Sequence, residues 1–310
     1  MGVKVTTKII KPWRFDVARN KSLELVPTDT DICVCTDLDE VFESGWRDKL
    51  EQTWQQDTQQ LKYKYVWNIL QDGSDGVTFL YEKIHKRRDF LWIYPVHEIL
   101  KYTGKKNINF KQNLDIVLKH LPDPTKSRSQ YLPLLELSLK EHPNSDRNTH
   151  YLAREYYFYN KLENAIKMFK KHLKMKNSIW DEERSASCRY LGDCYLKQNK
   201  LKLAERYYKK AIEECSKTRE PYLALALFYY TIKDYVLCLL TINSMLLITT
   251  KSLSYITNPD CFSELPYDLK SMCYYYLNDH EKALENAEIA LKINPNNTRI
   301  KNNLKFYKSI

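Results

Sequence analysis

The spacing of hydrophobic and polar residues changes near residue 120 of this 310-residue chain. Before that point, short runs of apolar and β-branched residues alternate with longer amphipathic segments. The short runs have the length and composition of β-strands, and the longer segments repeat their apolar positions at helical spacing. We therefore expect strands at residues 3–10, 31–36, 61–70, 77–85 and 106–120, and helices at residues 15–26 and 45–56. This order predicts a mixed α/β sheet domain.

From about residue 126 onward the pattern is helical and repetitive. Small residues anchor the repeats at Ala165, Ala204, Cys238 and Ala283, which are 39, 34 and 45 residues apart. The pattern resembles the tetratricopeptide repeat, a helical pair of about 34 residues whose helices approach closely at small side chains. An insertion at residues 252–264 accounts for the longest spacing. Because one repeat cannot bury its apolar face alone, we expect about four repeats in an all-α solenoid, with a protein partner on its surface.

Composition bears on the compartment and the partners. The formal charge is +10, with 19 Lys and Arg against 17 Asp and Glu in residues 1–120, and 30 against 22 in residues 121–310. The lysines are spread over many predicted helices, so we interpret them as solvated faces and expect no specific nucleic-acid partner. The richest apolar stretch, residues 221–232, is shorter than the roughly 20 residues that span a bilayer, so we expect no transmembrane segment. The eight cysteines contain no C-x-x-C pair, which is typical of free thiols in a cytoplasmic protein.

Two carboxylates follow directly on one of the predicted buried strands. Asp37 and Asp39 come after residues 31–36, in the sequence Asp-Leu-Asp-Glu. Ligands of open α/β sheets gather beyond the carboxyl ends of strands, and carboxylate oxygens suit Mg²⁺ or Mn²⁺ that is shared with substrate phosphates. The alternative interpretation is an acidic surface turn that contains Asp37, Asp39 and Glu40.

Two further clusters carry groups that suit phosphate or metal chemistry. The run from Trp92 to Glu98 combines aromatic residues with an imidazole, His97, and a carboxylate. His97 is a candidate metal or phosphate ligand, and Glu98 is a candidate general base. In the first predicted helix, the guanidinium of Arg19 can match phosphate oxygens in a forked geometry. The alternatives are a packed aromatic strand with a chance polar pair and a solvent-facing arginine.

The order of these motifs resembles family 2 glycosyltransferases of the GT-A fold. The resemblance is closest to the bacterial and viral subgroup in which that domain is followed by tetratricopeptide repeats. It rests on Trp13, Ala18-Arg19-Asn20, Asp37-Leu38-Asp39-Glu40, Gly45-Trp46, Trp92 and Pro95-Val96-His97-Glu98. It continues through residues 119–123, 126–128, 151–156, 191–195 and 219–221, and so covers nearly the whole chain.

The resemblance implies a metal-dependent glycosyltransferase. Such an enzyme moves a sugar from a nucleotide-sugar donor to a hydroxyl group of a glycan, lipid-linked or protein acceptor. Asp37 and Asp39 would hold Mn²⁺ or Mg²⁺ on the donor diphosphate, with His97 as a further metal ligand. The cation would neutralise charge as the nucleoside diphosphate leaves.

The resemblance also implies roles for the remaining motif residues. Arg19 and Asn20, with Asp37, would bind the nucleotide of the donor. Glu98 would be the catalytic base that deprotonates the acceptor hydroxyl. Trp92 would stack on a sugar ring.

The same resemblance sets domain boundaries and reveals one departure from the subgroup. We expect a partial GT-A domain at residues 1–121, a helical linker at 122–148 and the solenoid at 149–310. Complete members have a strand–helix–strand unit before the segment that matches residues 3–13. We therefore expect an incomplete mixed sheet with an exposed edge, which favours low solubility or self-association.

The sequence is also compatible with two other functions. The solenoid can be the functional part, a non-catalytic protein-binding scaffold that carries a relic glycosyltransferase half. A haloacid-dehalogenase-type phosphatase would use Asp37 as its nucleophile, but its mechanism needs a later acidic pair that the sequence does not offer before the repeats. Metal-dependent binding of a nucleoside diphosphate separates the glycosyltransferase from the scaffold.

Overall fold

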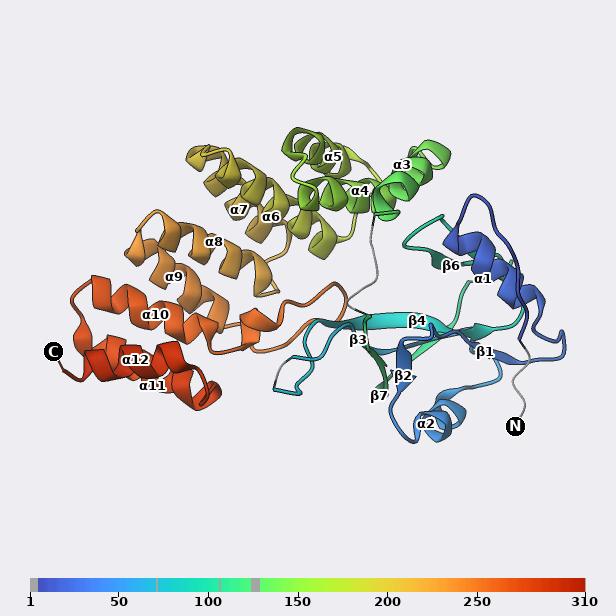
Figure 1. Cartoon of the computed structure of the whole chain (residues 1–310), viewed down its shortest axis with the longest axis horizontal. Coiled ribbons are helices and arrows are strands. Elements are labelled where there is room, and N and C mark those ends of the chain that lie inside the picture. The colour runs from blue at the N-terminus through green and yellow to red at the C-terminus, as the bar shows by residue number, and fades with distance from the viewer. Residues whose placement is uncertain (1–4, 71, 106, 124–128, 310) are drawn as a thin grey trace. The chain divides into compact units, whose positions relative to one another are not determined.

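The computed structural model describes residues 5–70, 72–105, 107–123 and 129–309. The described chain divides into two compact units, whose elements are labelled in Figure 1. Unit 1 holds the described residues of Met1–Ile69 and Leu80–Glu155, and unit 2 holds those of Leu70–Phe79 and Tyr156–Ile310. Unit 1 contains a mixed sheet and unit 2 is built from helices, so the predicted succession of α/β and all-α parts is confirmed.

A mixed sheet forms the centre of unit 1. Among the described residues it has five strands in the order β1-β4-β3-β7-β2. These strands are β1 (Ile32–Val34), β2 (Glu40–Phe42), β3 (Gln60–Val66), β4 (Thr78–Lys86) and β7 (Phe110–His120). The pair β3–β7 is parallel, whereas β1–β4 and β2–β7 are antiparallel. The side chains of Leu61, Ile84, Ile116 and Leu118 are fully buried and form the core of this sheet.

Helices and a small hairpin cover the sheet of unit 1. Helix α2 (Trp46–Thr53) packs on β7. Strands β5 (Phe90–Ile93) and β6 (Ile99–Tyr102) pair as an antiparallel hairpin, and helix α1 (Phe15–Glu24) packs on β5. Figure 1 shows α2 on one side of the sheet and α1 with the hairpin on the other. Gly45 starts α2 at a φ of 76°, a left-handed conformation that glycine adopts without strain. This turn lets the ring of Trp46 stack on Phe42 at 4.5 Å.

The predicted strand at residues 3–10 is wrong over its described part. Residues 5–10 have no regular structure, and none of the described strands pairs with them. Val5 and Ile9 are 85% and 79% exposed, so their β-forming side chains have no face to pack on. A strand is stabilised by its neighbours, and apolar residues alone do not supply one. Residues 3 and 4 of this prediction, and the motif at residues 126–128, lie outside the described residues.

Consecutive helices make up unit 2 and the segment that leads into it. The predicted linker at residues 122–148 contains α3 (Tyr131–Glu141) and the first turn of α4 (Asp146–Phe158). The helices that follow are α5 (Leu162–Lys174), α6 (Asp181–Lys197), α7 (Leu201–Glu214), α8 (Glu220–Thr231), α9 (Tyr235–Leu246), α10 (Leu265–Tyr276), α11 (His280–Ile293) and α12 (Thr298–Tyr307). From α5 to α12 each helix packs on the next one along the chain, which is the arrangement of a solenoid.

The repeat spacing of the sequence is also the spacing of the turns in unit 2. The tight turns between paired helices have a positive φ at Asn160, Asn199, Lys233 and Asn278, which again lie 39, 34 and 45 residues apart. Asparagine tolerates this left-handed conformation better than most residues, and it ends a helix there. The anchors Ala165, Ala204, Cys238 and Ala283 are all fully buried. At Gly192 a Cβ atom would lie 2.5 Å from the ring of Tyr208, so helices α6 and α7 meet where only glycine fits.

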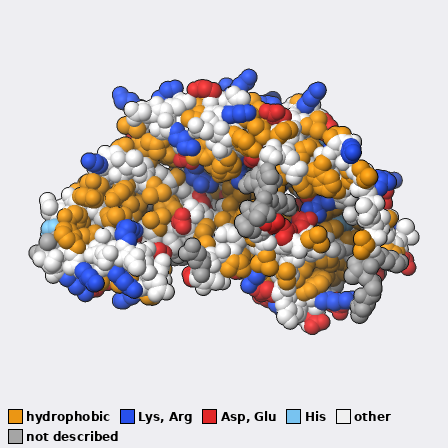
Figure 2. Space-filling model, viewed as in Figure 1, with side chains coloured by type: hydrophobic (Ala, Val, Ile, Leu, Met, Phe, Trp, Pro, Cys, Tyr) orange, Lys and Arg blue, Asp and Glu red, His pale blue; other side chains and the backbone are white. Residues whose placement is uncertain are grey.

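The cysteines are free, as the sequence predicts, and basic side chains are exposed on the helices of unit 2. All eight cysteines are free, and seven of them are buried. Figure 2 shows lysine and arginine side chains along the rim over α5 and α7. Within the described residues, no helix combines the length and the hydropathy that a membrane span requires.

Candidate functional site

Three of the predicted site residues meet in unit 1. Arg19 lies on α1, Asp37 follows β1, and Glu98 immediately precedes β6. Nη2 of Arg19 donates to both carboxylate oxygens of Asp37, at 2.9 and 3.0 Å, and its Nε donates to Oε1 of Glu98 at 2.5 Å. One guanidinium therefore joins the two carboxylates that the sequence assigned to metal binding and to base catalysis.

A second cation, Lys83, completes this cluster and was not predicted from the sequence. It lies on β4 with a side chain only 2% exposed, and its Nζ donates to Glu40 at 2.8 and 3.0 Å and to Asp37 at 3.1 Å. Glu40 is equally buried and accepts a further hydrogen bond from the hydroxyl of Tyr65 at 2.9 Å. The one signal in the sequence was a lysine inside a predicted strand, at the alternating positions of Tyr81 and His85, because a lysine on a buried strand face needs a carboxylate partner.

The ion pairs of this cluster favour the charged forms of Asp37 and Lys83. Burial alone would raise the pKa of Asp37, but the charges of Lys83 and Arg19 outweigh it and lower that pKa. Burial likewise opposes the charge of Lys83, and the nearby Tyr81, Glu40 and Asp37 reverse the effect and raise the lysine pKa. With three carboxylates and two cations, the cluster carries a formal charge of −1.

Trp92 lies against Arg19, and Asn20 binds the backbone of Trp92. The side chain of Asn20 donates to the backbone carbonyl of Trp92 at 2.8 Å and accepts from its backbone amide at 2.9 Å. The ring of Trp92 is 3% exposed and lies 4.8 Å from the Arg19 guanidinium. The ring of Trp92 thus packs on the guanidinium, while Asn20 fixes the backbone of Trp92. The roles of Asn20 in nucleotide binding and of Trp92 in sugar stacking stay predictions.

Asp39 and His97 occupy different surroundings from Asp37. Oδ2 of Asp39 lies 3.5 Å from Nε2 of His120, and its backbone carbonyl accepts from Leu121 at 2.7 Å. His97 has a φ of 50° and places its ring 4.3 Å from that of Tyr151. Across the described chain, no three His, Cys, Asp or Glu side chains are grouped so that they could hold a metal ion.

A divalent cation at this place would have to compete with the cations already present. The Asp37 and Asp39 side chains are 43% and 24% exposed, but both oxygens of Asp37 accept from Arg19 and one of them also accepts from Lys83. Two carboxylates are too few to hold Mg²⁺ or Mn²⁺ alone, but such cations commonly take their remaining ligands from water and substrate phosphates. A divalent cation at Asp37 and Asp39 stays a prediction.

In unit 2, the insertion after α9 folds back over the starts of α6 and α8. Ser252 donates to Glu182 of α6 at 2.9 Å, and Trp180 donates to Ser254 at 3.1 Å. Arg219, just before α8, donates to the backbone carbonyls of Ile248 and Cys261 at 2.6 and 2.9 Å, and so ties both ends of the segment. The predicted insertion is thus a fixed part of the solenoid.

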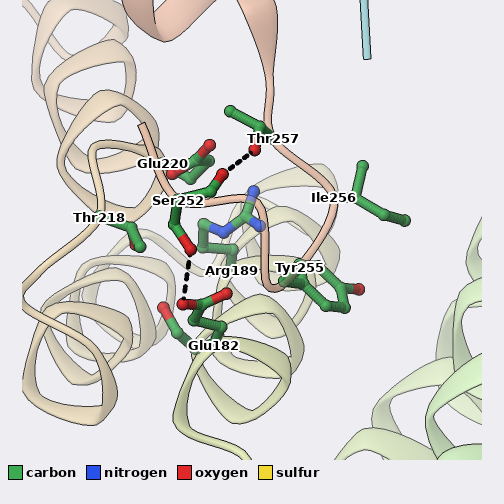
Figure 3. Close-up of a pocket in the computed structure, with 9 residues that line it drawn as sticks. Glu182, Arg189, Thr218, Glu220, Ser252, Tyr255, Ile256 and Thr257 are labelled. Carbon is green, nitrogen blue, oxygen red and sulfur yellow. Dashed lines mark hydrogen bonds between the residues drawn. The ribbon is translucent and has the colours of Figure 1, made fainter. Parts of the chain in front are cut away.

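A small cavity remains beneath this segment. Figure 3 shows Arg189 of α6 pointing into the curve of the chain that Ser252, Tyr255 and Thr257 form. The cavity has room for about one water molecule, which is too little for a peptide or a nucleotide. A ligand on this side of the solenoid would have to displace the insertion.

Comparison with known proteins identifies the repeats. The tetratricopeptide repeat family model matches residues 191–218 and 266–297. No curated protein sequence matches the chain.

Solved structures with the same kind of repeat also resemble the chain, at low identity. The tetratricopeptide protein YrrB, described with an unusual peptide-binding site, is 18% identical with a TM-score of 0.43, covering 57% of this chain and 82% of its own. The first such domain of Spaghetti, solved with an HSP90 peptide, is 18% identical with a TM-score of 0.36, covering 41% and 93%. PilF from Pseudomonas aeruginosa is 14% identical with a TM-score of 0.43, covering 57% and 72%. The family match shows that the C-terminal part of the chain contains tetratricopeptide repeats.

Proposed function

We propose that the chain is a protein-interaction scaffold that works through its tetratricopeptide repeats. The observation that supports this proposal is the stack of helices α5–α12, in which each element packs on its neighbours and leaves an extended surface exposed. Solenoids of this kind bind other proteins along that surface. The repeats therefore present a scaffold for a partner chain.

Charge favours an acidic segment as the partner. Residues 161–176, which include α5, contain six lysines and one glutamate. Lys167, Lys170 and Lys174 are exposed and lie at positions i, i+3 and i+7, so they share one face of α5. A stripe of like charge attracts chains of opposite charge and accelerates their association.

We expect the full-length protein to bind acidic peptides more tightly than neutral or basic ones. Fluorescence anisotropy with labelled 12-residue peptides of the three charge classes measures this difference. Reversing Lys167 and Lys170 to glutamate should weaken acidic-peptide binding by about tenfold or more, equivalent to about 1.4 kcal/mol. The matched control reverses Lys301 and Lys305, exposed lysines of α12, and changes the net charge equally. Equal weakening by both pairs, or no peptide binding by folded protein, would refute the proposed partner.

We infer a second candidate function in unit 1, the binding of a nucleotide-sugar donor by a glycosyltransferase site. It is favoured by the cluster in which Arg19, Asp37 and Glu98, far apart in the sequence, lie within hydrogen-bonding distance. The cluster carries a formal charge of −1, so it would repel a diphosphate that arrived without a cation. When bound, the cation would neutralise charge on the leaving diphosphate, with Asp37 and Asp39 as its protein ligands.

Isothermal titration calorimetry with UDP and GDP tests this second function. We expect no saturable binding of either nucleotide without Mn²⁺, weak binding of Mn²⁺ alone, and tight binding of the two together. Asp39→Ala should weaken the joint binding at least tenfold, whereas Asp48→Ala, an exposed carboxylate of α2, should leave it unchanged. Nucleotide binding that is independent of Mn²⁺ and unchanged by Asp39→Ala would contradict the proposed donor site. The absence of nucleotide binding in folded protein would contradict it as well.

A further inference from the structure

Helix α9 carries no charge on its outer side and exposes large apolar side chains there. Residues 235–250 carry no charged side chain. Its inner side is buried through Cys238, Leu239, Ile242 and Met245. Its outer side exposes Val236 by 54%, Leu240 by 57% and, just beyond the helix, Leu247 by 83%. A row of exposed large apolar side chains on an uncharged helix is often covered by a partner, so the outer side of α9 has the character of an interface.

The exposed side chains of α9 form a row with the spacing of one helix face. Val236, Leu240, Asn243 and Leu247 are all exposed and lie at positions i, i+4, i+7 and i+11. Figure 2 shows hydrophobic side chains gathered over the part of unit 2 where Figure 1 places α9. We call these four residues the α9 row.

The helices that occupy the same place in the preceding and following repeats have charged rows instead. The anchors Ala204, Cys238 and Ala283 align α7, α9 and α11 with one another. In this alignment the α9 row corresponds to four residues of α7, which we call the α7 row: Lys202, Arg206, Lys209 and Glu213. It also corresponds to four residues of α11, which we call the α11 row: Glu281, Glu285, Glu288 and Lys292. All eight of these charged residues are exposed.

At each of the four aligned positions, which we call levels, the α7 row and the α11 row carry charges of opposite sign. Lys202 corresponds to Glu281, Arg206 to Glu285, Lys209 to Glu288 and Glu213 to Lys292. Within one chain α7 packs on α8, α8 on α9, α9 on α10 and α10 on α11, so the α7 and α11 rows are kept apart. Lys209 lies 2.7 Å from Glu205 and Glu288 lies 3.4 Å from Lys308, but exposed ion pairs of this kind contribute little and can exchange partners. The complementarity of the two rows is therefore available to a contact between two chains.

We propose that a second copy of this chain docks on the α9 row through a two-fold axis parallel to α9. Rotation about that axis brings the α9 row of one copy against the α9 row of the other. It also places the α7 row of each copy opposite the α11 row of its partner, with the four levels in register. An isologous contact of this kind needs a self-complementary surface, and the apolar centre with opposite flanks provides one.

The size of the surface sets the expected strength of the dimer. Eleven residues of helix span about 17 Å, and three helices side by side span about 30 Å, so the contact covers roughly 500 Å² per copy. Stable complexes bury about 800 Å² per partner. The dimer is therefore expected to dissociate on dilution, and to weaken when salt screens its charged flanks.

Sedimentation velocity of the full-length protein over a range of micromolar concentrations tests the proposal. We expect a monomer–dimer equilibrium for the unaltered chain. Leu240→Arg should weaken it at least tenfold, because the two-fold axis sets the two new charges against each other. The matched control is Leu277→Arg, whose leucine is 41% exposed and lies outside the three rows. A monomer at every concentration, or a dimer that Leu240→Arg leaves intact, would overturn the proposal.

Charge reversal tests the alignment of the two copies. Lys202→Glu with Arg206→Glu should weaken the dimer about tenfold, since the α7 row would then repel the α11 row of the partner. Adding Glu281→Lys and Glu285→Lys in the same chain restores opposite signs across the contact and should restore the dimer. If the fourfold variant dimerises no better than the double variant, the proposed two-fold alignment is wrong. Circular dichroism of each variant confirms that these surface changes leave the fold intact.

Discussion

Replacing Lys83 by methionine is expected to lower the free energy of unfolding of unit 1 by about 3–5 kcal/mol. The side chains of Lys83 and Glu40 are both 2% exposed, and their closest atoms are 2.8 Å apart. Methionine fills a similar volume but leaves the Glu40 carboxylate buried without its cation. Removing one partner of a buried ion pair costs far more than the pair itself contributes, because the remaining charge cannot be solvated.

Chemical denaturation followed by tryptophan fluorescence measures this loss in the full-length chain. Tryptophan emission reports mainly on unit 1, which holds Trp13, Trp46, Trp54, Trp67 and Trp92, whereas unit 2 holds Trp180. The matched control is Lys62→Met on the neighbouring strand β3. Lys62 lies 3.4 Å from Glu82 with both side chains partly exposed, so its loss should cost less than about 1 kcal/mol.

A second substitution separates charge from packing. In the double variant Lys83→Met with Glu40→Gln the buried charge is gone, while the amide oxygen still accepts a hydrogen bond from Tyr65. More than half of the lost stability should return. A double variant as unstable as Lys83→Met alone would show that the lysine acts through its packing, and the interpretation of the cluster as a charge network would fail.

The regular elements of the fold could largely be predicted from the sequence because they follow its periodicity. Helix α1 and strand β7 lie within the ranges that the hydrophobic pattern predicted, at residues 15–26 and 106–120. The repeats of unit 2 were visible for the same reason, since the buried anchors recur at fixed spacing. Strands β2, β5 and β6 have three or four residues, too few to show an alternation, and were not predicted. Strand β1 is equally short, but it lies within the apolar run at residues 31–36 that predicted it.

The candidate site could be predicted only in part, because its contacts depend on strand register. The sequence motifs singled out Arg19, Asp37 and Glu98, and the structure brings them together. The sequence did not reveal that Lys83 lies beside Asp37. That contact arises from the antiparallel pairing of β1 with β4, which continues as the backbone amide of Cys35 donates to the carbonyl of Lys83. A shift of one residue in that pairing would turn Lys83 to the other face of the sheet.

Acidification is expected to destabilise unit 1 through His85. The imidazole is fully buried on β4, where burial, aided by the charge of Arg87, lowers its pKa from 6.5 to about 4, although a hydrogen bond to the carbonyl of Lys86 opposes the change. The folded state thus holds the neutral form, while the unfolded chain takes up a proton below about pH 6.5. The resulting stability is complete above pH 6.5 and is lost as the pH falls to about 4, a total of about 3 kcal/mol.

The slope of stability against pH distinguishes this titration from a loss of packing. His85→Asn keeps a side-chain N–H near the position of Nδ1, which lies 2.6 Å from the Lys86 carbonyl, but cannot take up a proton in this range. The variant should be less stable at pH 7.5, because it loses the contact of the imidazole with Phe90. Between pH 6.5 and 4 its free energy of unfolding should fall less steeply than that of the unaltered chain, by up to about 1.4 kcal/mol per pH unit. Parallel slopes would mean that the folded chain protonates His85 as readily as the unfolded one does, and that burial on β4 does not exclude its charge.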